Sequence, residues 1–444
     1  MMHSQWSGVG YDLVVVGAGA SGALVTAQHV RQGKPGRLAL IGVGPGAGRG
    51  VAYDTPFRSN LLNVPAWNMS AFPDDPGHFQ RWLAARTPGA DQGTFAPRLV
   101  YGAYLEEVLA EALRSPLVSP VPRRAVDLAR EGEGWRVLLD DGTTLAARRV
   151  VLALGNLPPN DPLHADPGAF PSYYRNPWDP GAATGLAATA PVLLIGSGLT
   201  MIDVALSLEE SGHQGPVTAI SRRGWLPRPH APYTPRPQPT LPEAFQTPKG
   251  AFRWIREQVR GGAEWRAVID GLRPHSQAIW RGWSVTDRAR FLRHAQGPWD
   301  IHRHRMAPEI AARLARLRDA GRLTVLRGRP LGLSAQDDAL VVRWRSPEDG
   351  QVHHTRAARV VNCTGPNRDY HRVGDPLIQN LRMRGLLTPD PLRLGWETSA
   401  DGQLHGADGT PVPGVFAMGP LRIGGEWESL AIPELRGQAA ELVG

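Results

Sequence analysis

The sequence contains a single cysteine and almost no lysine. Cys363 is the only cysteine among the 444 residues, so a disulfide within the chain, a CxxC redox pair and a cysteine-based zinc site are excluded. Lys34 and Lys249 are the only lysines, which means that arginine supplies nearly all of the 49 basic residues behind the net charge of +8. Because no run of five Lys or Arg residues occurs, we interpret this charge as solvated surface and expect no nucleic-acid partner.

Long apolar segments are missing as well. No segment reaches eighteen uninterrupted apolar residues, so we expect no transmembrane helix and no membrane partner. Residues 13–27 are largely apolar, but three glycines interrupt them and no Lys or Arg precedes them, which is unlike a signal peptide. We therefore expect a cytoplasmic protein. Its length predicts two or three domains, and its 51 glycines and 41 prolines predict many loops.

Two parts of the chain follow the same strand–turn–helix–strand plan. In the first part, the apolar patterns predict a buried strand, a helix and a second strand at residues 11–17, 22–32 and 38–41. In the second part, the same order recurs at residues 191–196, 200–210 and 217–220. This plan is the first half of a doubly wound parallel sheet, and the chain contains it twice.

Each unit continues into a predicted hairpin and a strand that ends in glycine. The first hairpin, at residues 135–149, leads to Gly155, and the second, at residues 340–356, leads to Gly365. The second unit is longer and must contain an insertion. The segments that supply it are a proline-rich crossing, a helical stretch and a further helix, at residues 226–249, 251–295 and 308–321. We assign the tryptophans of the helical stretch to the core of the insert: Trp254, Trp265, Trp280 and Trp283.

Gly17, Gly19 and Gly22 form a G-x-G-x-x-G pattern between the first strand and the first helix. The first glycine permits a tight turn, the second lets the backbone approach a pyrophosphate, and the third lets the helix pack on the strand. We therefore predict a dinucleotide site here. The acidic residue that ends the following strand in such sites, and that binds a ribose, is replaced by Gly42.

The second unit has a phosphate loop of its own. Gly196 and Gly198 occupy its first two glycine positions, Thr200 lies at the start of the helix, and Met201 replaces the third glycine. A side chain at this third position keeps the helix farther from its strand. Phosphate binding tolerates this spacing, so we predict a second nucleotide site.

Arg222 and Arg223 follow the next strand of the second unit. Positive charge at this point suits a 2′-phosphate and favours NADPH over NADH, the alternative being two solvated loop arginines. Two nucleotide loops imply two nucleotides, most economically a resident FAD in the first unit and a transient NADPH in the second. Without a second cysteine, the flavin must meet its electron acceptor directly.

These patterns predict an α/β fold with two Rossmann-like dinucleotide-binding domains, one for FAD and one for NAD(P)H, the second interrupted by a helical insert. We place the FAD-binding domain at residues 1–180 and 351–444. The NAD(P)H-binding domain then covers residues 181–350, with its insert at about 226–320. Nothing in the sequence indicates an oligomeric state.

Several segments together resemble one family of flavoproteins. They lie at residues 48–53, 60–65, 97–104, 196–203, 221–227, 299–308, 362–366 and 419–440. The chain resembles, along nearly its whole length, the FAD/NAD(P)-binding family that contains FAD-dependent urate hydroxylases and L-aspartate N-monooxygenases. The Baeyer–Villiger fingerprint F-x-G-x-x-x-H-x-x-x-W-P is absent, and Gly42 is the clearest departure from the family pattern.

The resemblance implies an FAD- and NADPH-dependent monooxygenase, in which a flavin C4a-(hydro)peroxide transfers oxygen to a small molecule and no side-chain nucleophile is needed. The partners would be this substrate and molecular oxygen. The residues expected to hold the cofactors, besides the two glycine loops and the paired arginines, are Arg49, Tyr53, Asn60, Asn63, Gly155, Gly365, Gly419 and Gly425.

Residues 299–308 are the best sequence candidate for a substrate or nicotinamide pocket. Arg303 and Arg305, with His304 between them, have the charge to clamp a carboxylate, a urate-like anion or a cofactor phosphate. The alternative is that these arginines cap the region of the helix at Pro308 or cross-link the domains. His302 and His304 are two residues apart and would point in opposite directions on a strand, so we expect no metal site.

The sequence favours hydroxylation of a small polar or anionic substrate, with N-hydroxylation of an amino acid or amine as the preferred version. Hydroxylation of a urate-like or purine-like ring is the closest alternative. An NAD(P)H–flavin dehydrogenase or reductase that does not activate oxygen belongs to a different class. A non-catalytic nucleotide-binding protein is the remaining alternative, and Gly42 makes it worth weighing.

Overall fold

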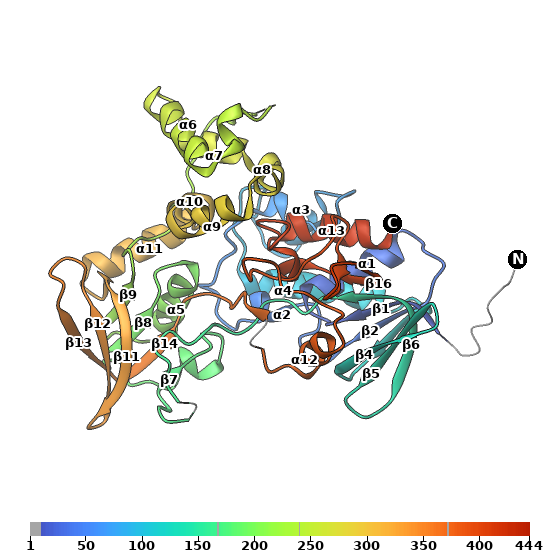
Figure 1. Cartoon of the computed structure of the whole chain (residues 1–444). Coiled ribbons are helices and arrows are strands. Elements are labelled where there is room, and N and C mark those ends of the chain that lie inside the picture. Colours follow the sequence, from blue (N-terminus) through green and yellow to red (C-terminus); the bar gives the residue numbers. More distant parts are fainter. Residues whose placement is uncertain (1–9, 167, 239, 371–372) are drawn as a thin grey trace, which may run out of the picture.

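The computed structural model describes residues 10–166, 168–238, 240–370 and 373–444. Two α/β domains lie side by side, and a helical insert stands above the junction between them (Figure 1). Within the described residues, no helix combines the length and the apolar character needed to cross a membrane.

The first domain is built on an eight-stranded, mostly parallel sheet. Its continuous path runs β15-β16-β6-β1-β2-β3, and the antiparallel hairpin β4–β5 joins it through β6. The strands are β1 (Tyr11–Val16), β2 (Leu38–Ile41), β3 (Val118–Val121), β4 (Ala125–Glu131), β5 (Gly134–Leu139), β6 (Thr144–Leu152), β15 (Gln403–His405) and β16 (Pro411–Ala417).

Alternate residues of β1 belong to different cores, as the period of a strand requires. Leu13 and Val15 pack on the helical face of the sheet, whereas Val14 and Val16 pack on the face that carries the hairpin. The helices involved are α1 (Ala20–Arg31), α2 (Gly50–Tyr53), α3 (His78–Ala84), α4 (Arg98–Ala112) and α13 (Ile432–Val443) on the first face and α12 (Pro376–Met383) on the second. Because both faces are covered, the central strands contain continuous buried apolar runs, at residues 13–16, 38–41 and 150–152.

The second domain repeats this plan on a parallel sheet of order β10-β9-β8-β14-β7. Helices cover one face and a three-stranded antiparallel sheet covers the other, as shown by the packing of Leu193 and Ile195 on Val342 and Trp344. The elements are β7 (Tyr173–Tyr174), β8 (Val192–Ile195), α5 (Leu199–Glu210), β9 (Val217–Ser221), α11 (Pro308–Asp319), β10 (Leu323–Arg327), β11 (Arg329–Gln336), β12 (Ala339–Arg345), β13 (Val352–Ala357) and β14 (Arg359–Asn362).

The fold class expected from the sequence is therefore confirmed, including the repetition: β3-β2-β1-β6-β16 corresponds to β10-β9-β8-β14-β7. The expected boundaries at 180 and 351 need correction. β14 pairs with both β8 and β7, so residues 173–174 and 352–362 belong to the second domain. The sequence repeat had already grouped the strand before Gly365 with the second unit, and strand pairing supports that grouping.

The helical insert lies between β9 and β10. Its helices are α6 (Pro248–Arg260), α7 (Trp265–Gly271), α8 (Ser276–Gly282), α9 (Val285–His294) and α10 (Gln296–Arg303). Helix α11, by contrast, packs on the second sheet through Ile310, Leu314 and Leu317, so it is the ordinary crossover helix of this unit. The insert contacts the first domain directly, because the Trp280 indole N–H donates to the Gly424 carbonyl over 2.7 Å.

Candidate functional sites at two glycine loops

The first glycine loop joins β1 to α1 by backbone contacts that exclude side chains. A Cβ on Gly22 would lie 1.9 Å from the Gly17 carbonyl oxygen, and a Cβ on Gly17, whose φ is +105°, would lie 2.5 Å from the Ala153 carbonyl oxygen. Gly19 is the N-cap of α1, with no side-chain cap and no acidic residue in the first turn. The uncapped backbone N–H groups of this turn form an anion-binding site.

Two distant segments enclose this loop. The Gly48 N–H donates to the Ala18 carbonyl over 2.8 Å, and a Cβ on Gly19 would touch Gly50 Cα at 3.4 Å. On the other side, a Cβ on Gly419 would lie 3.2 Å from the Ser21 hydroxyl. The segments that the sequence resemblance assigned to FAD, residues 49–53 and 419–425, thus reach the first loop through Gly50 and Gly419.

Other predicted cofactor residues of the first domain have protein partners. Arg49 Nη2 bonds Glu106 Oε2 at 2.6 Å. Asn60 is buried, donates to Thr55 and accepts from Ser207 of the second domain at 3.1 Å, so both ends of its amide are used. Tyr53 is buried, and desolvation raises the pKa of its phenol to about 12. The backbone carbonyl of Asn63 bonds His230, and Gly425 lies near Thr398.

Gly42, the residue that replaces the expected acid, has a φ of +94°. L-residues with a side chain are strained in this conformation. The turn after β2 therefore favours glycine, and Gly42 offers no carboxylate to a ribose.

The second glycine loop opens onto a cavity of about 470 Å³ at the carboxyl end of β8. A Cβ on Gly198 would meet no atom within 4 Å, whereas Met201, at the third glycine position, is fully buried. The residues that line the cavity include five predicted for cofactor binding: Gly196, Gly198, Thr200, Arg222 and Gly365. Gly155, the predicted residue at the corresponding point of the first unit, bonds Tyr370 through its carbonyl.

Among the described residues, two arginines and no acidic residue line this cavity. One is Arg222 and the other is Arg329, which sequence reasoning missed. Arg223 lies outside the lining: its guanidinium stacks on Trp225 at 4.9 Å and bonds the Arg293 carbonyl. Arg329 follows β10 by two residues, so the only sequence signal for it is that β10 neighbours β9 in a doubly wound sheet.

The two arginines predicted for a substrate clamp are already paired with carboxylates. Arg303 Nε bonds Glu428 Oε2 at 3.0 Å, and Arg305, with only 4% of its side chain exposed, bonds Asp270 at 2.5 Å. His304 lies 3.8 Å from Asp300, and burial lowers the pKa of its imidazole to about 4. These contacts agree with the alternative reading, that the arginines cross-link elements of the protein.

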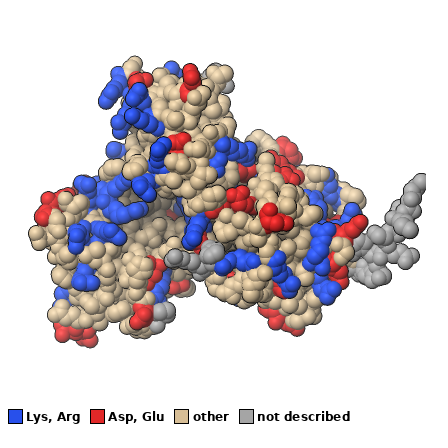
Figure 2. Space-filling model, in the orientation of Figure 1, with Lys and Arg blue, Asp and Glu red and all other residues tan. Residues whose placement is uncertain are grey.

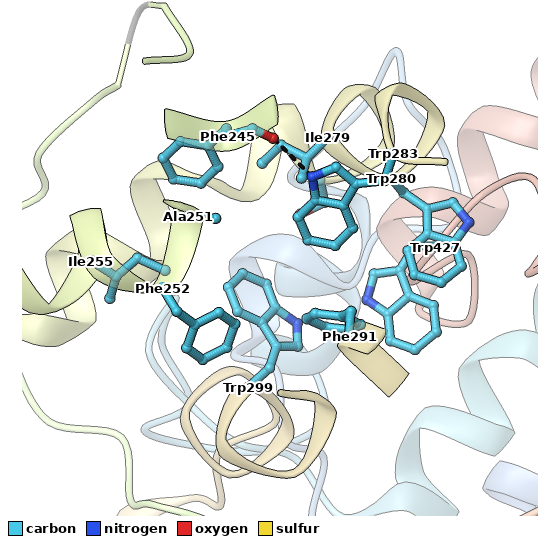
Figure 3. A pocket seen from close by; sticks show the side chains of 11 residues that line it. Phe245, Ala251, Phe252, Ile255, Ile279, Trp280, Trp283, Phe291, Trp299 and Trp427 are labelled. Atoms are coloured by element: carbon cyan, nitrogen blue, oxygen red, sulfur yellow. Dashed lines mark hydrogen bonds between the residues drawn. The ribbon is translucent and has the colours of Figure 1, made fainter. Parts of the chain in front are cut away.

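The aromatic residues of the insert form a closely packed cluster (Figure 3). Trp280 stacks on Trp427 at 4.6 Å, and Phe291 lies between Trp427 and Trp299. The space left among these rings is about 30 Å³, room for one or two water molecules. The tryptophans therefore serve as core, and they join the insert to the C-terminal loop.

The ends of the two central strands are interlocked. Leu157, after β6, pairs with Asn367, after β14, and the Tyr370 hydroxyl donates to the Gly155 carbonyl over 2.9 Å. Asn362 also donates to the Asn160 carbonyl over 2.9 Å. Because ligands bind at the carboxyl ends of parallel strands, this pairing turns the two nucleotide sites towards each other.

Comparison with known proteins agrees with this architecture. Residues 14–157 match the model of an FAD-NAD(P)-binding family. No curated protein matches the chain significantly.

Solved structures resemble the chain along almost its entire length. An L-lysine 6-monooxygenase from Pseudomonas syringae superposes with a TM-score of 0.69 at 15% identity, covering 98% of both chains. The reduced form of an ornithine hydroxylase from Pseudomonas aeruginosa gives 0.66 at 17% identity, again over 98% of both chains. A bacillithiol disulfide reductase from Bacillus cereus gives 0.56 at 14% identity, over 98% of this chain and 97% of the other. These similarities establish the two-domain fold of such flavoproteins.

Proposed function

We propose that the chain is an FAD-dependent, NADPH-consuming monooxygenase that hydroxylates the nitrogen of an amino acid or amine. The observation that carries the proposal is the interlocking of the two central strand ends, which turns two glycine loops towards one junction. A nicotinamide bound at one loop can then deliver hydride to a flavin bound at the other.

The residues present fit both nucleotides. The first turn of α1 offers uncapped N–H groups without a competing carboxylate, which suits the pyrophosphate of FAD. The cavity at the second loop has the volume, the open glycine at Gly198 and the two arginines that a polyanion requires. Arg222 and Arg329 are the residues that we assign to the 2′-phosphate of NADPH.

A dithiol mechanism does not suit this chain. Cys363 is the sole cysteine, it is 3% exposed at the end of β14, and desolvation raises the pKa of its thiol far above the usual range. A thiolate is therefore not available at neutral pH. The higher TM-scores with the lysine and ornithine hydroxylases than with the disulfide reductase also favour hydroxylation.

Bound FAD would supply electron transfer from NADPH to oxygen and transfer of one oxygen atom to the substrate. The protein's own contribution is position and exclusion of water. The buried Trp299 and Trp280 of the insert close the junction against the C-terminal loop, where Glu428 accepts the Trp299 indole N–H over 2.6 Å. A dry, fixed site limits side reactions with water.

Oxygen uptake by the purified protein tests the proposal. Protein that binds FAD should consume oxygen and NADPH together when the correct amine is added, and should form a hydroxylamine. The substrates to compare are lysine, ornithine, aspartate, cadaverine and urate, the last of which tests ring hydroxylation. Reduction of an added acceptor without oxygen, with no hydroxylated product from any of them, would instead indicate a dehydrogenase. A protein that cannot be loaded with flavin contradicts the proposal altogether.

A further inference from the structure

One residue of the second nucleotide cavity has an unusual backbone conformation. Four described residues other than glycine have a positive φ: His164, Asp337, Arg393 and Glu428. Of these, His164 lines the cavity of about 470 Å³ at the second glycine loop, and its φ is +50°. Histidine tolerates this left-handed region better than most residues do, but glycine adopts it without cost. An imidazole kept in a strained conformation at a binding cavity points to a use of that side chain there.

The turn that carries His164 is built around the carboxylate of Asp161. One oxygen of Asp161 accepts the backbone N–H of Leu163 and the other accepts the backbone N–H of Ala165, each over 2.9 Å. The hydroxyl of Tyr173 in β7 also donates to Asp161, over 2.5 Å. Because Asp161 fixes the residues on both sides of His164, the backbone at His164 is held in its conformation.

The turn leaves the imidazole of His164 available to a ligand. Leu163, the preceding residue, is 4% exposed and packs in the core of the second domain. His164 itself is exposed, and its imidazole makes no hydrogen bond or ion pair with a described residue. It differs in this respect from Arg303 and Arg305, which are paired with carboxylates of the protein.

His164 and the two arginines of the cavity come from different sides of the sheet. Asn160, which precedes the turn, accepts a hydrogen bond from Asn362 at the end of β14 over 2.9 Å, and the turn is also tied to β7. Arg222 and Arg329 follow β9 and β10 instead. In the strand order β10-β9-β8-β14-β7, the glycine loop after β8 therefore lies between the arginines and the segment that carries His164.

The surroundings of the glycine loop suit a diphosphate. Gly198 is the N-cap of α5, with no side-chain cap and no acidic residue in the first turn, so the backbone N–H groups of this turn are available to an anion. The surface is hollowed below the insert, and Lys and Arg side chains gather on the second domain beside this hollow (Figure 2). On the β14 side of the loop, the imidazole N–H of His164 is a side-chain donor that the cavity offers to the same anion.

We propose that His164 donates a hydrogen bond to the pyrophosphate of the nucleotide bound at the second glycine loop. Arg222 and Arg329 then read the 2′-phosphate, which only NADPH carries, whereas His164 holds the part that NADPH and NADH share. The strained turn at Asp161 is kept because it places the imidazole at the cavity. The inference rests on the proposed function, because that function places a nicotinamide nucleotide here.

Nucleotide binding and thermal unfolding of the FAD-loaded protein test this role without relying on turnover. We would titrate NADP⁺ by calorimetry and NAD⁺ by competition against it. His164→Gly should weaken both nucleotides about tenfold and by the same factor, because one hydrogen bond to a charged group is lost. The melting temperature should not fall, because glycine adopts a φ of +50° without strain. A residue with a purely structural role would not combine weaker binding with undiminished stability.

Three further variants complete the design. Since glycine also loosens the turn, His164→Asn is the second variant: asparagine tolerates a positive φ, and its shorter side chain should weaken both nucleotides as well. Asp337→Gly is the matched control, because Asp337 has a φ of +54° in the turn between β11 and β12, outside the cavity lining, and should leave both affinities unchanged. Arg222→Ala provides the contrast, since it should weaken NADP⁺ and not NAD⁺.

The outcomes separate this inference from the proposed function. Unchanged affinities in both His164 variants would overturn it, and so would a loss confined to NADP⁺, which would assign the imidazole to the 2′-phosphate. Weaker binding together with lower melting temperatures in both variants would mean that His164 acts only through the fold of the turn. If the expected pattern appears and no amine is hydroxylated, the proposed hydroxylation fails while the role of His164 stands.

Discussion

The two nucleotide units share their topology and differ at the third position of the glycine loop. In the first unit, Gly22 lets the backbone of α1 lie directly on the Gly17 carbonyl, with no room for a methyl group. In the second, the buried side chain of Met201 fills the corresponding position between α5 and its sheet. The same fold therefore uses backbone contact in one unit and a side chain as spacer in the other.

The two loops also differ in how far the surrounding chain encloses them. Gly48 and Gly419 approach the first loop from both sides, whereas the second loop opens onto a cavity of about 470 Å³. An enclosed loop suits a nucleotide that stays bound, and an open one suits a nucleotide that enters and leaves in every cycle. Two units with the same strand order can therefore differ in whether their cofactor stays bound or exchanges in every cycle.

The largest effect should come from a methyl group added to the enclosed loop. In Gly22→Ala the new Cβ would lie 1.9 Å from a backbone oxygen, so α1 must move away from β1. We expect a loss of stability of about 3 kcal/mol or more, together with loss of bound FAD. Thermal unfolding and flavin absorbance measure the two effects.

The matched substitution in the open loop is Gly198→Ala. Its Cβ would meet no protein atom within 4 Å, so the melting temperature should be unchanged, while the methyl group enters the space assigned to NADPH and should raise its KM. Equal melting temperatures for the two variants would contradict the contrast between the loops.

The helices after the two loops also differ in charge, which predicts a pH effect. Asp203 on α5 is 7% exposed and lies 3.2 Å from Arg98 of the first domain, yet desolvation raises its pKa to about 6. Between pH 4 and 6 the unfolded chain loses this proton while the folded chain keeps it, so the contribution of Asp203 to stability decreases as the pH rises.

Asp203→Asn cannot ionise and should remove this dependence. Relative to wild type, the variant should gain about 2 kcal/mol between pH 4 and pH 6, seen as a rising difference in melting temperature. Asp337→Asn, at a position exposed to solvent, should show a constant difference. A constant difference for Asp203→Asn as well would mean that its carboxyl group is ionised normally in the folded protein.

The open cavity predicts which arginines read the 2′-phosphate. Arg222→Ala and Arg329→Ala should each raise the KM for NADPH about tenfold and that for NADH less than twofold, since loss of one charge-assisted contact costs about 1.5 kcal/mol or more. Arg223→Ala should change neither, because its side chain lies against Trp225. Steady-state kinetics with NADPH and with NADH measure these KM values. An increase in the KM for NADPH alone in Arg223→Ala would contradict the assignment of the cavity as the binding site.

The sequence predicted what depends on local pattern. Glycine spacing, a buried strand and a helix start lie within a few residues of one another, so the loops at Gly17 and Gly196 and the helix at Pro308 could be located directly. The assignment of that helix to the insert was wrong, because it packs on the second sheet as a crossover helix. The repeat also revealed where the second unit is interrupted. Strand pairing was harder, because the two residues of β7 join the second sheet only through β14, far along the chain.

The pairing of charged side chains could not be predicted in the same way. Arg303 and Arg305 were chosen because two arginines in a distinctive motif are visible in the sequence, whereas their partners Glu428 and Asp270 are separated from them by 125 and 35 residues. Arg329 has no motif around it, and its place at the second glycine loop depends on the pairing of β10 with β9. Sequence shows which charges exist, and only the packing shows which of them are already paired.

The smallest expected effect concerns Gly42, which replaces the acidic residue expected in the first unit. Restoring an acid by Gly42→Glu should not improve FAD binding, because the φ of +94° at this position strains any residue that carries a side chain. We expect a loss of stability of about 1 kcal/mol and an unchanged or weaker affinity for FAD. Flavin titration of the apoprotein and thermal unfolding measure both. Tighter FAD binding in this variant would mean that the turn can relax, and that the missing carboxylate, rather than the backbone, limits how firmly the first unit holds its nucleotide.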